Sequence, residues 1–270
     1  MGAQPWWRAA AAEFVGVFTL VFVGAGAVVT LTHFNTLNGG DATTVIIGVA
    51  LAHGLAIAVM VTALGHLSGG HFNPAVTLAA MATRRMPPPI GLLYMAAQIL
   101  GGVFGAILLV ASLPADWWQP AMLGTPLLGA GIDPAKGVLI EAALTFILVI
   151  VIFGAAMDQR HPNWGVAGFA IGLTITLAIL MGAPLTGPAL NPARAFSTAL
   201  VAQSFGPTHY VYWVGPILGG IVAGLVYDLA FVETKVKPSK IPPAPTPETP
   251  AEPLPPASEP VMTEPDSPMD

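Results

Sequence analysis

The sequence predicts an all-α membrane protein in which six transmembrane helices and two re-entrant half-helices form an inverted 3+3 repeat. Three observations carry this prediction: a composition poor in charge, six long apolar segments, and two copies of one short motif inside apolar sequence. Of the 270 residues, 54% are hydrophobic and 9% are charged, and the mean hydropathy is +0.74. Soluble domains carry about 25% charged residues, so a water-soluble globule is excluded.

The predicted spans are apolar segments of about 20 residues, the length that crosses a bilayer as a helix. They cover residues 9–31, 43–65, 90–112, 137–156, 165–182 and 210–231. Two further apolar segments, 67–83 and 184–200, are too short and too interrupted by Gly and Pro to span. Irregular backbone at membrane depth is tolerated only where it lines a cavity or is buried in protein, so these segments are interpreted as re-entrant.

The same short sequences occur in both halves of the chain, at a constant spacing. Asn-Pro-Ala occurs at 73–75 and 191–193, and Ile-Leu-Gly-Gly occurs at 99–102 and 217–220, so that each pair lies 118 residues apart. Each half holds three spans and one re-entrant segment, and because three is odd, the second half runs upside down relative to the first. Such repeats place their functional site near the bilayer midplane. The repeats cover about residues 9–112 and 137–231.

Basic residues predict the orientation of the chain. Eight basic residues lie outside the re-entrant segments. With six spans, seven of them fall on one side of the membrane and Lys136 falls on the other. The seven are Arg8, Arg84, Arg85, Arg160, Lys235, Lys237 and Lys240. Both termini are therefore expected to be cytoplasmic, and the short termini suggest the plasma membrane of a prokaryote. Residues 234–270 are rich in Pro and poor in large apolar residues, which predicts a disordered tail behind a membrane domain of residues 1–233.

Each Asn-Pro-Ala motif is a helix start. Asn is a favoured N-cap residue and Pro is favoured at the first helical position. The motifs therefore predict half-helices that begin at Asn73, Pro74 and Ala75 and at Asn191, Pro192 and Ala193. A helix N-terminus carries partial positive charge, so two such ends that meet at the midplane disfavour cations. The Asn amides are expected to donate hydrogen bonds to a passing solute.

The residues that lead into each motif are expected to be extended, with carbonyl groups that form a ladder of acceptors. Gly suits backbone that runs close to a ligand. The residues of this ladder are Gly69, Gly70, His71, Gly187 and Ala189. The chain contains no cysteine, which excludes disulfides and Cys-based metal sites. No nucleophile–base or metal-ligand constellation is found, so neither an enzyme nor a metal or cofactor site is predicted, and nothing suggests nucleic acid.

These motifs resemble the aquaporin (major intrinsic protein) family over about residues 9–231. The resemblance lies in the strings SGGHFNPAVT and GPALNPARAF, in the Arg directly after the second motif, and in the helix openings AEFVGVFTLVF and IEAALTFILVI. It implies a homotetramer with one pore per subunit, each a passive channel for water that excludes protons and ions. Residues 1–233 would form the channel domain.

The resemblance assigns Arg194 to a selectivity constriction, and an intramembrane Arg is a functional candidate in its own right. By position relative to the motifs, its partners are His53, Ile179 and Pro188. The strict water-channel pattern has Phe in place of this His and His in place of this Ile, so the constriction is more similar to that of plant tonoplast-type and some microbial members.

Glu13 and Glu141 are acids within apolar sequence. The family implies that they are structural carboxylates that accept hydrogen bonds from the re-entrant backbones, and a proton relay is the alternative interpretation.

Water is the first expected solute, with ammonia or hydrogen peroxide as further candidates. A glycerol or small-solute facilitator is the alternative, although Ala195 and Ala199 stand where glycerol facilitators typically carry Asp and Lys. A coupled secondary transporter is the alternative from another class, because inverted repeats and broken helices occur there too. Such a transporter would need a titratable coupling site at the midplane.

Overall fold

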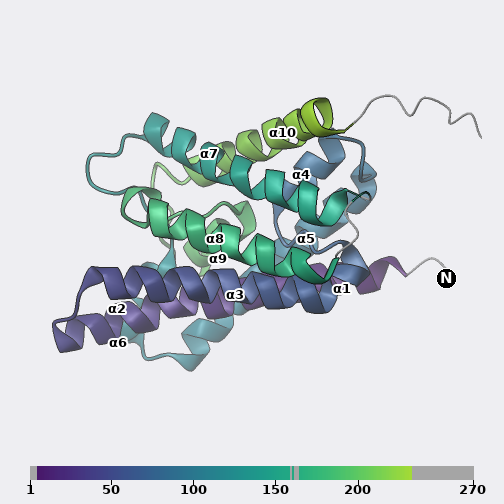
Figure 1. The fold of residues 1–270 in the computed structure, drawn as a ribbon. Coiled ribbons are helices and arrows are strands. Elements are labelled where there is room, and N and C mark those ends of the chain that lie inside the picture. The colour runs from purple at the N-terminus through teal and green to yellow at the C-terminus, as the bar shows by residue number, and fades with distance from the viewer. Residues whose placement is uncertain (1–4, 159, 161–163, 233–270) are drawn as a thin grey trace, which may run out of the picture. The chain divides into compact units, whose positions relative to one another are not determined.

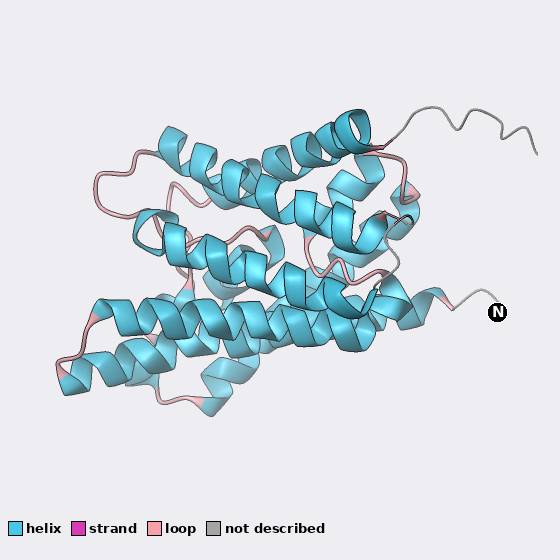
Figure 2. Ribbon diagram, viewed as in Figure 1, coloured by secondary structure: helices cyan, strands magenta, loops and turns pink. Residues whose placement is uncertain are grey.

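The computed structural model describes residues 5–158, 160 and 164–232, among which no strand occurs. Within this part of the chain, six helices are long and apolar enough to cross a membrane (Figures 1 and 2). The prediction of six spans is therefore confirmed. The predicted tail, 234–270, lies outside the described residues.

The first span is a continuous helix built from α1, the π-helical segment η1, and α2. The other spans are α3, α5, α7 continued by the π-helical η3, α8 and α10. The bounds are α1 Trp6–Thr19, η1 Leu20–Ala25, α2 Gly26–Asn38, α3 Ala42–Ser68, α5 Pro88–Ser112, α7 Pro134–Ile152, η3 Phe153–Met157, α8 Trp164–Thr186 and α10 Val211–Phe231. The first helix ends at Gly39, which takes a left-handed φ of 61°. It is longer than the predicted 9–31, because the polar residues after 31 do not interrupt it.

The two predicted re-entrant segments each contain a short helix, α4 Pro74–Ala82 and α9 Pro192–Val201. At 1.5 Å per residue, a helix of this length crosses about half of a 30 Å hydrocarbon core. The connection between α5 and α7 contains two further short elements, α6 Ala115–Trp118 and the 3₁₀ turn η2 Met122–Gly124. These two short elements were not expected from the sequence.

The packing follows the inverted repeat. Figure 1 shows α7 beside α10 and α3 beside α8, and α1 packs on α5. Each half-helix packs mainly on the last span of the other repeat, α4 on α10 and α9 on α5. The repeats therefore exchange their half-helices, which brings the starts of α4 and α9 together in the middle of the bundle.

Glycine permits the closest of these helix contacts. A Cβ added at Gly101 would collide with the backbone of Phe14, and one added at Gly219 would collide with the backbone of Ala142. These two glycines occupy equivalent positions in the repeats, and each lets the third span of its repeat approach the first.

We predict that Gly219→Ala lowers stability by about 1–3 kcal/mol, the range expected for overpacking, even though Ala favours a helix more than Gly. The reason is that the backbone of Ala142 cannot move aside as the end of a side chain can. The measurement is the thermal unfolding midpoint in detergent. Gly154→Ala is the matched helical control, because its Cβ would make only ordinary contact with Tyr227. Equal midpoints for both variants would contradict the proposed packing role.

Candidate functional site

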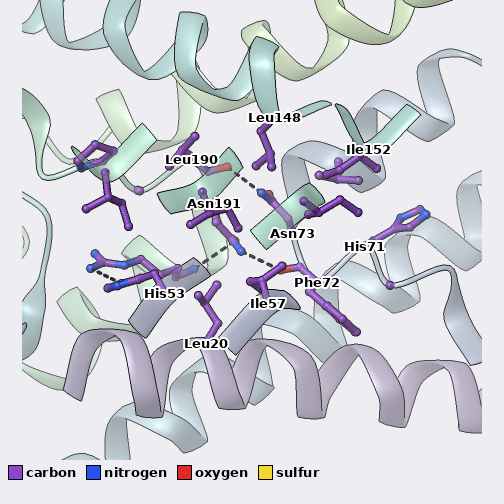
Figure 3. Close-up of a pocket in the computed structure, with 18 residues that line it drawn as sticks. Leu20, His53, Ile57, His71, Phe72, Asn73, Leu148, Ile152, Leu190 and Asn191 are labelled. Atoms are coloured by element: carbon purple, nitrogen blue, oxygen red, sulfur yellow. Dashed lines mark hydrogen bonds between the residues drawn. The ribbon is translucent and has the colours of Figure 1, made fainter. Parts of the chain in front are cut away.

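The two Asn-Pro-Ala motifs form a reciprocal clasp. Asn73 Oδ1 accepts a hydrogen bond from the Ala75 N–H at 2.9 Å, and Asn191 Oδ1 accepts one from the Ala193 N–H at 3.0 Å. Each Asn amide then donates to the opposite loop: Asn73 Nδ2 to the Leu190 carbonyl and Asn191 Nδ2 to the Phe72 carbonyl, both at 2.7 Å (Figure 3).

Each amide carries a second N–H. Asn73 and Asn191 both line a cavity at the clasp, so that second donor is available to a solute there.

The cavity at the clasp, called here the narrow cavity, has a volume of about 30 Å³. One water needs about 10–15 Å³ of such space, so about two waters fit. Its wall is mostly aliphatic, with side chains from both repeats; these include Leu20, Ile57, Val76, Leu148, Ile152 and Ile175 (Figure 3). A solute in this cavity therefore meets a mostly apolar wall, whose polar groups are the Asn pair, the side chains of His53, His71 and Arg194, and the backbone of the loops.

A second cavity, called here the vestibule, has a volume of about 190 Å³. The residues shared by the two cavities are His53, Ile179, Pro188 and Arg194. These are the four residues that the spacing from the motifs assigns to the constriction. The structure places them together where the vestibule and the narrow cavity adjoin.

Arg194 is buried, with 4% of its surface exposed. Its Nη2 lies 3.4 Å from His53 Nε2, and its Nε and Nη1 have no hydrogen-bond partner among the described residues. His53 Nδ1 lies 2.9 Å from the Val49 carbonyl, which can only accept, so we assign the proton of the neutral ring to Nδ1. His53 Nε2 then accepts from Arg194, and the donors left for a solute belong to Arg194.

Two buried glutamates hold the re-entrant loops. Glu13 accepts from the backbone N–H groups of His71 at 3.0 Å and Phe72 at 2.6 Å. Glu141 accepts from the backbone N–H groups of Ala189 at 3.1 Å and Leu190 at 2.9 Å. Both side chains are completely buried. Each carboxylate thus satisfies peptide groups that have no helical partner.

Residues that the sequence analysis did not single out complete these contacts. The hydroxyls of Ser68 and Thr186 donate to Glu13 and Glu141 at 2.6 and 2.8 Å. The hydroxyls of Tyr94 and Tyr212 donate to the carbonyls of Ser68 and Thr186 at 2.9 and 2.8 Å. Each pair is separated by 118 residues, the offset of the Asn-Pro-Ala motifs. A search for polar residues at that offset would have found them.

The loops before the motifs are not uniformly extended, which corrects the expectation. Gly69, Gly70 and Gly187 have φ of 90°, 62° and 54°, and Phe72 and Leu190, directly before each Asn, also have positive φ. These reversals accompany the hydrogen bonds that the loop N–H groups donate to the glutamates. Of the five residues predicted for the carbonyl ladder, Gly69 lines neither cavity. Gly70, His71 and Ala189 line the narrow cavity, and Gly187 lines the vestibule.

Comparison with known proteins identifies relatives over most of the chain. The model of the major intrinsic protein family matches residues 2–227. Aquaporin TIP4-4 of Zea mays is 43% identical over 225 residues, which are 83% of this chain and 87% of the relative. The lens fiber major intrinsic protein of Gallus gallus is 38% identical over 84% of this chain and 83% of its own length. Aquaporin-4 of Bos taurus is 35% identical over 84% of this chain and 68% of its own length.

Among solved structures, the aquaglyceroporin from Plasmodium falciparum has a TM-score of 0.70 and 23% sequence identity. The match covers 84% of this chain and 97% of that chain. At this identity the likeness establishes the fold alone.

We predict that Glu13→Gln lowers both the thermal unfolding midpoint in detergent and the solute flux through the protein. The variant replaces one acceptor oxygen by an NH₂ group, which faces either the donors of Ser68 and His71 at Oε1 or those of Phe72 and Gln98 at Oε2. Each donor left unsatisfied costs about 1–3 kcal/mol. Asp116→Asn, at an exposed position, is the control for loss of one carboxylate. An unchanged midpoint in Glu13→Gln would show that the carboxylate does not hold the loop.

Proposed function

The chain belongs to the major intrinsic protein family, and from this membership and its pore geometry we propose that it is a passive membrane channel for water. The resemblance to aquaporins seen in the sequence is thereby confirmed. Members of this family are channels, so the prediction that the chain is not an enzyme is also confirmed. The observation that carries the proposal is the adjoining pair of cavities, of which the narrower has room for about two waters.

The exclusion of protons and ions follows from three positive features on one path. The N-termini of α4 and α9 meet at the clasp, and each carries the partial positive charge of a helix start. Arg194 adds a full charge at the constriction. A water that accepts hydrogen bonds from both Asn73 and Asn191 has its lone pairs engaged, which interrupts a proton-conducting chain. Half-helix dipoles and an Arg are known devices for excluding protons and cations.

Water is favoured over glycerol as the main solute. Ala195 and Ala199 are fully buried where glycerol facilitators typically carry Asp and Lys. Aquaporin relatives from plant and animal support the same choice. Ammonia and hydrogen peroxide are further proposed solutes, because Ile179 leaves one side of the constriction apolar while Arg194 supplies free donors.

A coupled transporter is less well supported. Such a protein needs a titratable site at the midplane that exchanges its proton or ion with the path. Glu13 and Glu141 are instead buried acceptors of several hydrogen bonds from loop backbone and hydroxyl groups. The proposed pore therefore offers no free carboxylate within the described residues that line the two cavities.

The protein is a multi-pass membrane protein. We propose that both termini are cytoplasmic, and the contacts of two basic residues expected on that side, Arg85 and Arg160, with the end of α10 support this. Arg85 pairs with Asp228 at 2.6 Å, and Arg160 donates to the Phe231 carbonyl at 2.7 Å. Arg160 also donates to Asp158 and holds the pKa of that carboxyl well below its usual range.

The relatives named above come from a plant and from vertebrates, and they give no support to a prokaryotic plasma membrane. Assembly as a homotetramer is proposed from the family resemblance.

The channel is tested in proteoliposomes by stopped-flow light scattering. We expect rapid osmotic shrinkage with a low activation energy, and no increase in proton leak measured with an internal pH dye. Gradients of protons or sodium should leave the flux unchanged. Bilayer-level water permeability in vesicles that contain folded protein would refute the proposal, and gradient-dependent uptake would favour the transporter.

The proposed constriction is tested with the double variant His53→Phe/Ile179→His. A larger ring and an added donor should narrow the neck and favour water, so the ratio of ammonia to water permeability should fall roughly tenfold, the low end of what one group in a pocket discriminates. Side-by-side flux of water, ammonia and glycerol measures this ratio. His66→Phe, at an exposed position on α3, is the matched control. An unchanged ratio would count against these residues as the filter.

A further inference from the structure

The two ring-bearing residues of the constriction, His53 and Pro188, each lie against a glycine. We propose that Gly24 and Gly182, which line neither the narrow cavity nor the vestibule, determine the width of the constriction by leaving the space that these rings occupy. They are specificity-determining residues that act through the rings and not through contact with the solute. This inference rests on the proposed function of the two cavities as a water path.

Gly24 lies in the π-helical segment η1 and is buried against the imidazole of His53. A Cβ added at Gly24 would lie 2.6 Å from His53 Cδ2 and 2.8 Å from Cγ and Nε2. Carbon atoms in favourable contact are about 3.5–4.0 Å apart. The ring therefore occupies its observed position only because residue 24 has no side chain, and a methyl group there requires a shift of about 1 Å.

The direction of that shift follows from the other contacts of the ring. The Nδ1–H group donates to the Val49 carbonyl on the same helix at 2.9 Å, which limits movement along α3. Nε2 accepts from Arg194 at 3.4 Å, and the ring also borders both cavities. Displacement away from Gly24 therefore moves the imidazole into the space between the cavities and disturbs its contact with Arg194. In a path whose narrow cavity has room for only about two waters, such a shift obstructs passage.

Gly182 has the same relation to Pro188. A Cβ added there would collide with the Pro188 ring and approach Leu144 Cδ1 at 3.0 Å. Pro188 cannot retreat freely, because the next residue, Ala189, donates its N–H to Glu141. Gly182 lies three residues after Ile179 on α8, so one turn of this helix supplies both an apolar wall of the constriction and the space behind a second wall. Two different helices thus leave room behind two of the four constriction residues.

The test is a double-mutant cycle on water permeability per protein in proteoliposomes. Gly24→Ala should lower the permeability about tenfold, which corresponds to about 1.4 kcal/mol of barrier. In the His53→Ala background the ring is absent, so the same substitution should leave the permeability of that background unchanged. Gly26→Ala is the matched control, because its Cβ meets only the flexible end of Leu109. Gly182→Ala is tested in the same way against a Pro188→Ala background.

Two outcomes overturn the proposal: an unchanged permeability in Gly24→Ala, or an equal loss in both backgrounds, which would indicate a general packing defect. A structure of Gly24→Ala provides a readout that does not depend on flux. The distance from His53 Nε2 to Arg194 Nη2 should increase from 3.4 Å. If the unmodified protein passes no water, the proposed function fails, whereas this distance still decides whether Gly24 positions the ring.

Discussion

The fold depends on hydrogen-bond partners for the peptide N–H groups of the re-entrant loops, which lie at membrane depth but outside any helix. Each re-entrant loop carries N–H groups at membrane depth, where an unsatisfied group costs several kcal/mol. Glu13 and Glu141 accept hydrogen bonds from these groups on the two loops. Because a carboxylate only accepts, it turns the loop N–H groups toward itself and leaves the opposite side of the loop to the cavities. This orientation of the loop determines the position of the Asn that follows it, and therefore the position of each half-helix.

The two repeats keep the same arrangement but differ where the proposed selectivity lies. Val76 and Arg194 are equivalent in position, and both line the narrow cavity. Gln98 donates to Glu13 and to Thr77, whereas the equivalent residue of the second repeat is Pro216. The first repeat therefore holds its loop with additional side-chain hydrogen bonds. The second repeat lacks these bonds and places the Arg194 guanidinium next to the narrow cavity. The two repeats therefore share one backbone arrangement but contribute different side chains to the proposed filter.

The sequence predicted the features that depend on residues close together in the chain. The spans follow from apolar length, and the starts of α4 and α9 follow from Asn and Pro. The grouping of His53, Ile179, Pro188 and Arg194 followed from the family resemblance and from spacing relative to the motifs. The exchange of Asn hydrogen bonds between the two loops could not be predicted, because both of these bonds join residues more than 100 positions apart. The same holds for the space behind His53, which depends on the packing of the first helix against α3.

The observed orientation of His53 changes how the constriction can act on a solute. A histidine in a pore suggests a donor to the solute, but here Nδ1 is engaged by Val49 and Nε2 faces Arg194. Within the part of the chain that the structure describes, Nε and Nη1 of Arg194 have no partner, and they belong to a group that cannot lose its charge under ordinary conditions. A small neutral molecule with a lone pair gains hydrogen bonds there and again at the Asn amides. In the proposed pore, a cation that enters from the vestibule meets the charge of Arg194 and then two helix N-termini. No acidic side chain is found among the described residues that line the two cavities, so the proposed path disfavours cations throughout.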